Sequence, residues 1–253
     1  MLTIPASVLL GFLMVLVRMA GAFVFVPLPI NGAGPSQLRV VLALACTFAL
    51  YPRWPAVNPP TGLAQMFVWL ISEAALGVSI GLAVSFISES LTVGAQMLSL
   101  QAGYGFASVV DPTTQADSGV LLVVAQLTAG LLFFATGLDH QVVQAFAWSL
   151  DKYPPGAFAI SRGAAELLLR TGAGVFVVGL RIALPIIGLM LMTDIALALL
   201  GRINSQLQLV SLAFPTKMLL ALAMLSTILV VFPALYNGFA AQVFSAVRSI
   251  VAR

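Results

Sequence analysis

Charged side chains are scarce in this sequence, and their scarcity excludes an ordinary soluble domain. Only 8% of the 253 residues are Asp, Glu, Lys or Arg, whereas 61% are apolar. Soluble globular domains carry about 25% charged residues and about 45–50% apolar ones. A soluble fold of this length could not cover its surface with so few polar groups. Much of the chain must therefore face lipid or other apolar protein.

Residues that carry chemistry are equally few. Cys46 is the only cysteine, which excludes intrachain disulfides and cysteine-based metal clusters. His140 is the only histidine, and the sequence has no P-loop, G-x-G-x-x-G or G-x-S-x-G motif. We therefore expect no enzyme activity, no cofactor and no metal. The 11 basic residues are spread singly along the chain, so nucleic acid is not an expected partner either.

Long apolar segments occupy most of the chain. Residues 90–110, 118–138 and 218–247 contain no charged side chain, and residues 6–30 and 163–200 contain only isolated ones. A membrane-spanning helix needs about 20 apolar residues. The hydropathy pattern thus predicts an all-α, polytopic membrane protein of about six hydrophobic segments.

Proline and glycine are frequent within this apolar pattern. The chain has 14 Pro and 21 Gly, and Pro185, Pro215 and Pro233 lie inside or beside apolar segments. A proline inside a helix removes a hydrogen bond and kinks the helix, and in lipid the freed carbonyl needs a new partner. One interpretation is bent, broken helical hairpins held against other protein. The alternative is ordinary proline kinks in a membrane bundle.

Five residues spaced by four form a ridge on one predicted helix. Positions four apart share one helix face, and glycines there let a neighbouring backbone approach closely. We define the subunit-packing ridge as Glu73, Gly77, Gly81, Ser85 and Glu89. It either contacts a partner subunit or packs within the chain, and the sequence leaves both alternatives open.

Two polar segments interrupt the apolar pattern. The first is a re-entrant or lumen-facing loop, or else an ordinary connection between helices. It contains Gly103, Tyr104, Gly105, Phe106, Val109, Val110, Asp111, Pro112 and Gly119. The second is the tip of a C-terminal helical hairpin, or else a solvated loop. It contains Arg202, Gln206, Gln208, Pro215 and Lys217.

Two isolated charges lie within one apolar run. They are Arg181 and Asp194. An unpaired charge at bilayer depth costs about 2.5–3.5 kcal/mol on insertion scales. We therefore expect each of them to face protein or water and to have a partner.

Taken together, these segments resemble the R family of flagellar protein-export gates and its injectisome T-type relatives, over nearly the whole chain. The resemblance is carried by E-x3-G-x3-G-x3-SF from Glu73, by QAGYG leading into Asp111-Pro112, by FFATGLDH, by SLDKYPPG, and by RINSQLQ with FPTK. The family's C-terminal motif tends to read R-x-x-P-Q-x-N. Arg202 and Gln206 match it, whereas Ser205 and Gln208 depart from it. Asp139 stands where relatives often have histidine or glycine.

The resemblance implies a non-enzymatic structural and gating subunit of the flagellar type III protein-export channel. Its location would be the basal body in the bacterial inner membrane, in contact with lipid. Its partners would be the export-gate P and Q proteins, a B-type switch protein and the A-type export protein. Unfolded rod, hook and filament subunits would be the substrates, and the loop from Gly103 to Gly119 would plug the closed lumen.

The resemblance also implies one export-gate membrane domain over residues 1–253. Residues from 1 to about 160 would be a P-like part, and residues from about 161 to 253 a Q-like C-terminal helical hairpin. Three alternatives remain at this point: the equivalent subunit of a virulence injectisome, a small-solute secondary transporter, and a membrane scaffold without passage function. A transporter of this kind typically contains an inverted repeat, and none is visible in the sequence.

Overall fold

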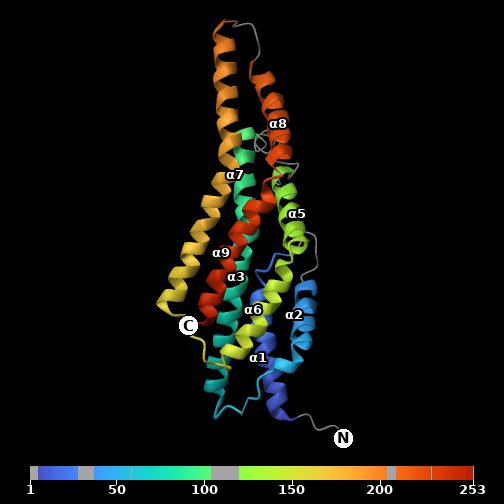
Figure 1. Cartoon of the computed structure of the whole chain (residues 1–253), viewed down its shortest axis with the longest axis vertical. Coiled ribbons are helices and arrows are strands. Elements are labelled where there is room, and N and C mark those ends of the chain that lie inside the picture. Colours follow the sequence, from blue (N-terminus) through green and yellow to red (C-terminus); the bar gives the residue numbers. More distant parts are fainter. Residues whose placement is uncertain are drawn as a thin grey trace. The chain divides into compact units, whose positions relative to one another are not determined.

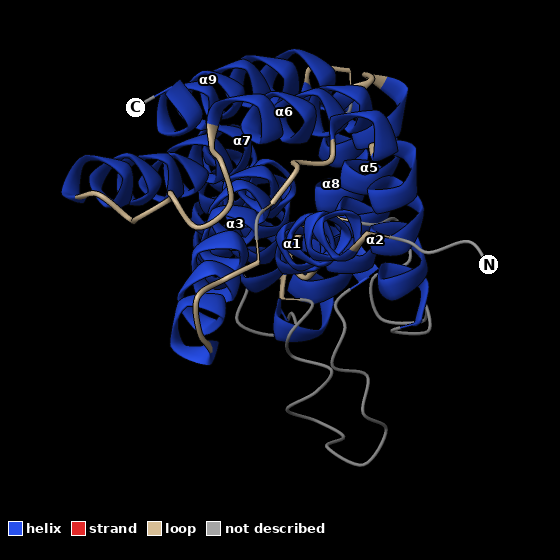
Figure 2. Ribbon diagram, turned by 90° about the horizontal axis from the view of Figure 1, so that it is seen from below, coloured by secondary structure: helices blue, strands red, loops and turns tan. Residues whose placement is uncertain are grey.

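Every regular element in the described part of the chain is a helix (Figure 1). The computed structural model describes residues 5–27, 37–57, 59–103, 120–203, 209–228 and 230–252. Its α-helices are α1 (Ala6–Phe23), α2 (Gln37–Ala49), α3 (Leu63–Ala102), α5 (Val120–Ala135), α6 (Leu138–Lys152), α7 (Arg162–Ile203), α8 (Leu209–Ile228) and α9 (Phe232–Ala252). A 3-10 helix, η1 (Tyr51–Arg53), follows α2. Figure 2 shows these helices joined by loops, and the all-α prediction is confirmed.

Three helices in the described ranges are long and apolar enough to cross a membrane, namely α1, α3 and α7. The pair α5 and α6 is a fourth candidate, bent by 64° at a short break. Helix α2 is apolar but shorter. The hydrophobic segments predicted from the sequence therefore correspond to three or four candidate spans in the described residues. The bent pair is a broken helix of the kind that was expected.

The bend between α5 and α6 lies at a glycine and not at a proline. Gly137 has a φ of 70°, in the left-handed region that glycine adopts without steric cost. By contrast, Pro185 lies inside α7 and Pro215 inside α8, and both helices continue past these prolines. Pro233 is the second residue of α9, where the missing N–H has no helical partner to lose.

The chain divides into two compact units. Unit 1 comprises Met1–Ile87, Phe133–Gly172 and Ala240–Arg253, and unit 2 comprises Ser88–Leu132 and Ala173–Phe239. The two units are described separately below.

Unit 1 has its core around one face of α1. Val15, Met19 and Ala22 are buried there at spacings of four and three, as expected for one stripe of a helix, and Met14 is buried beside Val15. Buried side chains from the start of α3, from α6 and from the end of α9 complete the core: Leu76, Ile80, Ala83, Val84, Val142, Phe146, Val243 and Val247. Because one face of α1 is buried, polar side chains on that face are kept away from solvent.

Unit 2 packs the second half of α3 against α7 through a pair of glycines. A Cβ atom on Gly94 would lie 3.2 Å from the carbonyl oxygen of Gly179, so these backbones approach closely. Tyr236 on α9 donates a hydrogen bond to the carbonyl oxygen of Ala129 at 3.1 Å, and its hydroxyl lies 3.4 Å from that of Ser88. Helix α9, which carries Tyr236, is not among the described helices that are long and apolar enough to cross a membrane. Burial raises the pKa of Tyr236 to about 12, so the phenol remains a hydrogen-bond donor at neutral pH.

Candidate functional site

Helices α1 and α3 of unit 1 meet at backbone contact. A Cβ atom on Gly77 would lie 2.0 Å from the carbonyl oxygen of Arg18, and one on Gly81 would lie 2.4 Å from that of Ala22. From the other side, a Cβ atom on Gly21 would lie 2.9 Å from the carbonyl oxygen of Ala74. Side-chain carbons are not found at such distances. Glycine at these positions therefore sets the separation between the two helices.

A buried ion pair lies one helical turn from this contact. The Nε atom of Arg18 on α1 donates to Oε2 of Glu73 on α3 at 2.6 Å. Both side chains are only 1% exposed. Removing two charges from water costs several kcal/mol per ion, and their attraction offsets this cost only when the remaining hydrogen-bonding groups are also satisfied.

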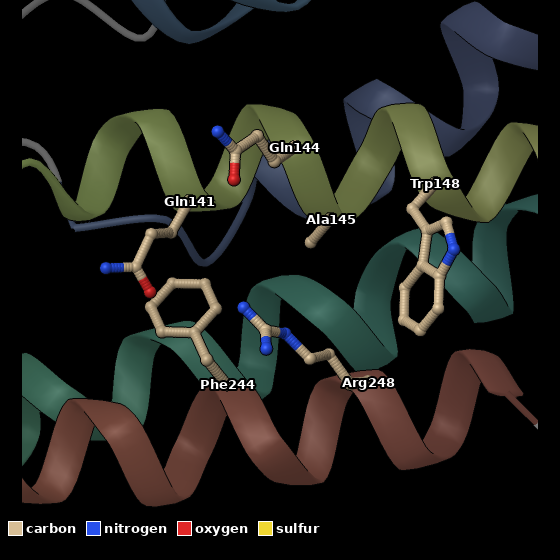
Figure 3. Close-up of a pocket in the computed structure, with 6 residues that line it drawn as sticks. All are labelled: Gln141, Gln144, Ala145, Trp148, Phe244 and Arg248. Carbon is tan, nitrogen blue, oxygen red and sulfur yellow. The ribbon is translucent and has the colours of Figure 1, made fainter.

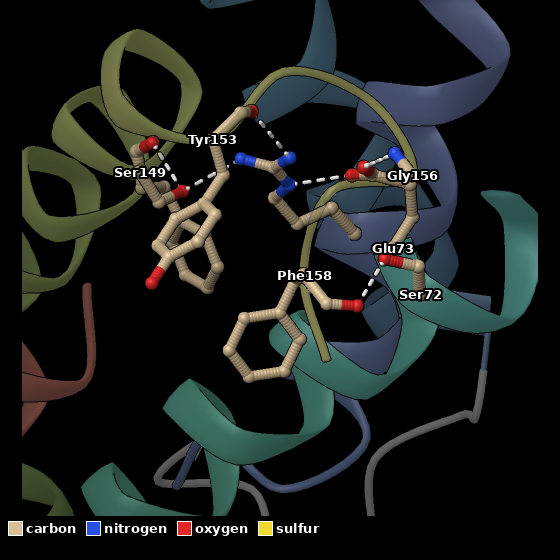
Figure 4. A network of polar contacts seen from close by, with 8 residues as sticks. Ser72, Glu73, Ser149, Tyr153, Gly156 and Phe158 are labelled. Atoms are coloured by element: carbon tan, nitrogen blue, oxygen red, sulfur yellow. Dashed lines mark hydrogen bonds and ion pairs between the residues drawn. The ribbon is translucent and has the colours of Figure 1, made fainter. Parts of the chain in front are cut away.

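The remaining groups of the pair are satisfied by the end of α6 and the turn that follows (Figure 4). Arg18 donates from Nη1 to the hydroxyl of Ser149 at 3.1 Å and from Nη2 to the carbonyl oxygen of Tyr153 at 3.3 Å. The second carboxylate oxygen of Glu73 accepts a hydrogen bond from the backbone N–H of Gly156 at 3.2 Å. One ion pair thus joins α1, α3, α6 and the turn after α6.

Two further contacts attach the turn after α6 to α3, and one aromatic pair packs within the turn. Gly156 has a φ of 79°, and a Cβ atom there would lie 2.0 Å from Cδ1 of Trp69. The hydroxyl of Ser72 donates to the carbonyl oxygen of Phe158 at 2.6 Å. The rings of Tyr153 and Phe158 pack edge to face, with their centroids 5.5 Å apart. These contacts make residues 153–158 a fixed connection between α6 and α7.

The chemistry of this cluster is structural. The guanidinium donates from all three of its nitrogens, and the carboxylate accepts at both of its oxygens. Each guanidinium nitrogen and each carboxylate oxygen thus has a partner within the chain. Within the described ranges, no three His, Cys, Asp or Glu side chains gather as a metal site would require.

Three residues of the subunit-packing ridge contact α1 within unit 1. Gly77 and Gly81 contact α1, and Glu73 pairs with Arg18 on the same helix. These three residues therefore pack within the chain, which was one of the two alternatives for the ridge. Ser85 is half-buried and donates to the carbonyl oxygen of Leu82, while Glu89 is exposed. A contact between the ridge and a partner subunit stays a prediction.

Only the first residue of the predicted plug loop lies in the described part of the chain. Gly103 has a φ of 82°, and its N–H bonds to the carbonyl oxygen of Leu100 at 3.3 Å, just beyond the end of α3. The others lie outside the described residues: Tyr104, Gly105, Phe106, Val109, Val110, Asp111, Pro112 and Gly119. The plug assignment stays a prediction.

The predicted C-terminal hairpin is described in part. Arg202 is exposed in the last turn of α7, and Pro215 is exposed on α8. Lys217 on α8 forms an ion pair with Asp194 on α7, so the prediction that Asp194 has a partner is confirmed. Gln206 and Gln208 lie outside the described residues.

Arg181 is the other charge that was expected to have a partner. It is exposed on α7, and its having a partner stays a prediction.

Sequence reasoning identified Glu73 but not the residues that surround it. Arg18, Ser149 and Gly156 were not assigned to the site. A usable signal was present, because Arg18 and Glu73 are isolated opposite charges in two apolar helices. Such charges are stable only when paired.

These features define a class: a helical membrane protein whose few polar residues serve helix packing. The chain belongs to the family of bacterial export proteins, family 1, whose sequence model matches residues 9–243. This confirms the resemblance drawn from the sequence motifs.

Individual relatives extend the match over most of the chain. The flagellar biosynthetic protein FliR of Escherichia coli (strain K12) is 25% identical over 218 residues, which cover 86% of this chain and 83% of that protein. FliR of Caulobacter vibrioides is 28% identical over 194 residues, covering 76% of this chain and 77% of that protein. FliR of Bacillus subtilis is 22% identical over 238 residues and covers 90% of both chains.

Proposed function

We propose that this chain is a non-enzymatic structural and gating subunit of the flagellar type III protein-export channel in the bacterial inner membrane. The observation that carries the proposal is the family match over residues 9–243. The relatives named above are all flagellar biosynthetic proteins, which favours the flagellar assignment over the injectisome alternative. Unfolded rod, hook and filament subunits are the proposed substrates.

The lengths of the helices support membership in a larger assembly. Helices α3 and α7 contain 40 and 42 residues, whereas a bilayer crossing needs about 20. Helix α7 also exposes large apolar side chains along its length, among them Leu169, Phe176 and Ile203. These surfaces need cover from lipid or from other proteins. The proposed partners are the export-gate P and Q proteins, a B-type switch protein and the A-type export protein.

The proposal keeps the internal division predicted from the sequence. Residues from 1 to about 160 are the proposed P-like part, and residues from about 161 to 253 the proposed Q-like hairpin. The ion pair between Asp194 and Lys217 supports the second assignment, because it joins α7 and α8, two of the three described helices in that part. The loop from Gly103 to Gly119 is the proposed plug.

Deleting the gene in its own bacterium tests the proposal. We expect the culture medium to lose hook and filament proteins, and a plasmid copy of the chain to restore them. Affinity purification of a tagged chain from the restored cells should recover the P and Q gate proteins. Normal export of filament protein by the deletion strain would contradict the proposal. Loss of injected virulence proteins alone would support the injectisome alternative, and loss of solute uptake alone would support a transporter.

A further inference from the structure

A cavity of about 290 Å³ lies between α6 and α9 of unit 1. Four of its lining residues come from α6 and two from α9: Gln141, Gln144, Ala145, Trp148, Phe244 and Arg248. Figure 3 shows the guanidinium of Arg248 extending from α9 toward α6, between the aromatic side chains of Phe244 and Trp148. The small side chain of Ala145 faces the same space from α6. The cavity therefore combines one cation, two amides and two aromatic side chains.

The charge of Arg248 is not neutralised by the carboxylates that the structure describes in unit 1. Each of these carboxylates already has a partner beside it: Glu73 has Arg18, Asp151 has Arg53 and Glu166 has Arg170, while Asp139 lies 3.1 Å from the ring of His140. Arg248 is itself exposed at the cavity. Its guanidinium is thus available to an anion from outside the chain.

The lining residues favour an oxyanion that carries hydroxyl groups. A guanidinium offers two parallel N–H donors that match the oxygens of a phosphate. The amides of Gln141 and Gln144 can each donate to a phosphate oxygen or accept from a hydroxyl. None of the six lining residues is acidic, so a cationic group on the ligand would find no charge partner. The cavity is also slightly smaller than the about 300–1,000 Å³ of typical drug-sized sites.

The position of the cavity favours a lipid as the source of that oxyanion. Tryptophan and arginine are enriched where a membrane protein passes from hydrocarbon to headgroups. Helix α6 is the more polar member of the bent pair, since it carries Asp139, His140, Asp151 and Lys152, whereas α5 carries no charged residue. We propose that the cavity binds the headgroup of an anionic phospholipid such as phosphatidylglycerol. The phosphodiester lies on Arg248, and the glycerol hydroxyls lie on Gln141 and Gln144.

Lipid binding to the purified full-length chain tests this site. The measurement is native mass spectrometry in detergent, with phosphatidylglycerol and phosphatidylcholine titrated separately. We expect phosphatidylglycerol to bind at least about tenfold more tightly than phosphatidylcholine. Arg248→Gln should reduce phosphatidylglycerol binding about tenfold, because a charge-assisted hydrogen bond is lost. Gln144→Ala should reduce it by a smaller factor. Arg170→Gln is the matched control, because Arg170 is an exposed arginine of the same unit that is paired with Glu166.

Several outcomes would overturn the proposal. These are equal binding of the two lipids, unchanged binding by Arg248→Gln, or an equal loss in Arg170→Gln. Competition by inorganic phosphate as strong as that by soluble glycerophosphoglycerol would show that the site takes free phosphate. If Arg248→Gln binds lipid normally but no longer recovers a partner protein, the cavity holds a protein carboxylate instead. The test is independent of export, so its failure leaves the proposed function untouched.

Discussion

At the scale of single residues, Arg18 and Glu73 depend on each other for their burial. Replacing one of them leaves the other charged and unpaired in the core, which costs about 3–5 kcal/mol. We expect Arg18→Met to lower the thermal stability of the purified chain in detergent strongly. Arg18→Met combined with Glu73→Leu should recover a large part of the loss, because apolar side chains tolerate this environment.

The pair Arg53–Asp151 provides the matched control for that prediction. Its side chains are 48% and 51% exposed, and an exposed ion pair contributes about 0–1 kcal/mol. Arg53→Gln should therefore change the unfolding temperature little. A loss as large as that of Arg18→Met would mean that burial does not determine the contribution of these pairs.

Gly156 combines two constraints that can be separated by substitution. Its positive φ makes any other residue strained by about 1–2 kcal/mol, and a Cβ atom would also collide with Trp69. Gly137 has a similar φ of 70° but nothing within 4 Å of an added Cβ atom. We expect Gly156→Ala to be destabilised more than Gly137→Ala in thermal unfolding. The combination Gly156→Ala with Trp69→Ala should reduce the difference, and equal losses in the two single variants would contradict the collision.

At the scale of helices, the close contact of α1 and α3 is the feature most sensitive to a side chain. Leucine at position 77 or 81 would separate the two backbones. We expect Gly77→Leu and Gly81→Leu to destabilise the chain on its own, and consequently to prevent its assembly with partners. Gly188→Leu is the control on α7, because nothing lies within 4 Å of an added Cβ atom there. The measurements are unfolding of the isolated chain and native gels of the co-expressed gate proteins.

The outcome separates the two alternatives for the ridge. An isolated chain of normal stability that fails to assemble would make the glycines a subunit contact. Normal stability and normal assembly together would leave the ridge without either role.

Sequence periodicity located this helix contact but not the site built on it. The spacing of four placed Glu73, Gly77 and Gly81 on one face, because that relation is local to one helix. Arg18 lies 55 residues from Glu73, and Ser149 lies 131 residues from Arg18. Such pairings depend on how helices pack, and a single sequence does not contain that information. The bend at Gly137 was missed for a related reason, since prolines were the expected points of breakage and α7 and α8 accommodate theirs.

At the scale of the whole molecule, a protein-conducting channel must be closed to ions when idle. A hydrophobic constriction achieves this by excluding water, and glycines allow it to move aside. We expect deletion of part of residues 106–118 to leave the export complex assembled but permeable to small ions. Ion-flux measurements on cells with the deletion, compared with cells carrying the intact chain, check this. An assembled complex that stays tight would contradict the plug assignment.

The lengths of α3 and α7 have a consequence for the life of the protein in the cell. At 1.5 Å per residue, the 40 residues of α3 extend about 60 Å, twice the roughly 30 Å of a bilayer's hydrocarbon. Much of α3 is buried within the chain, but its two ends expose apolar side chains, among them Leu63, Phe67 and Leu100, that a partner protein can cover. A newly made copy without partners presents that surface to chaperones and membrane proteases. Its lifetime is then set by the supply of its partners, so the amount of this chain in a cell should follow the amount of the assembly.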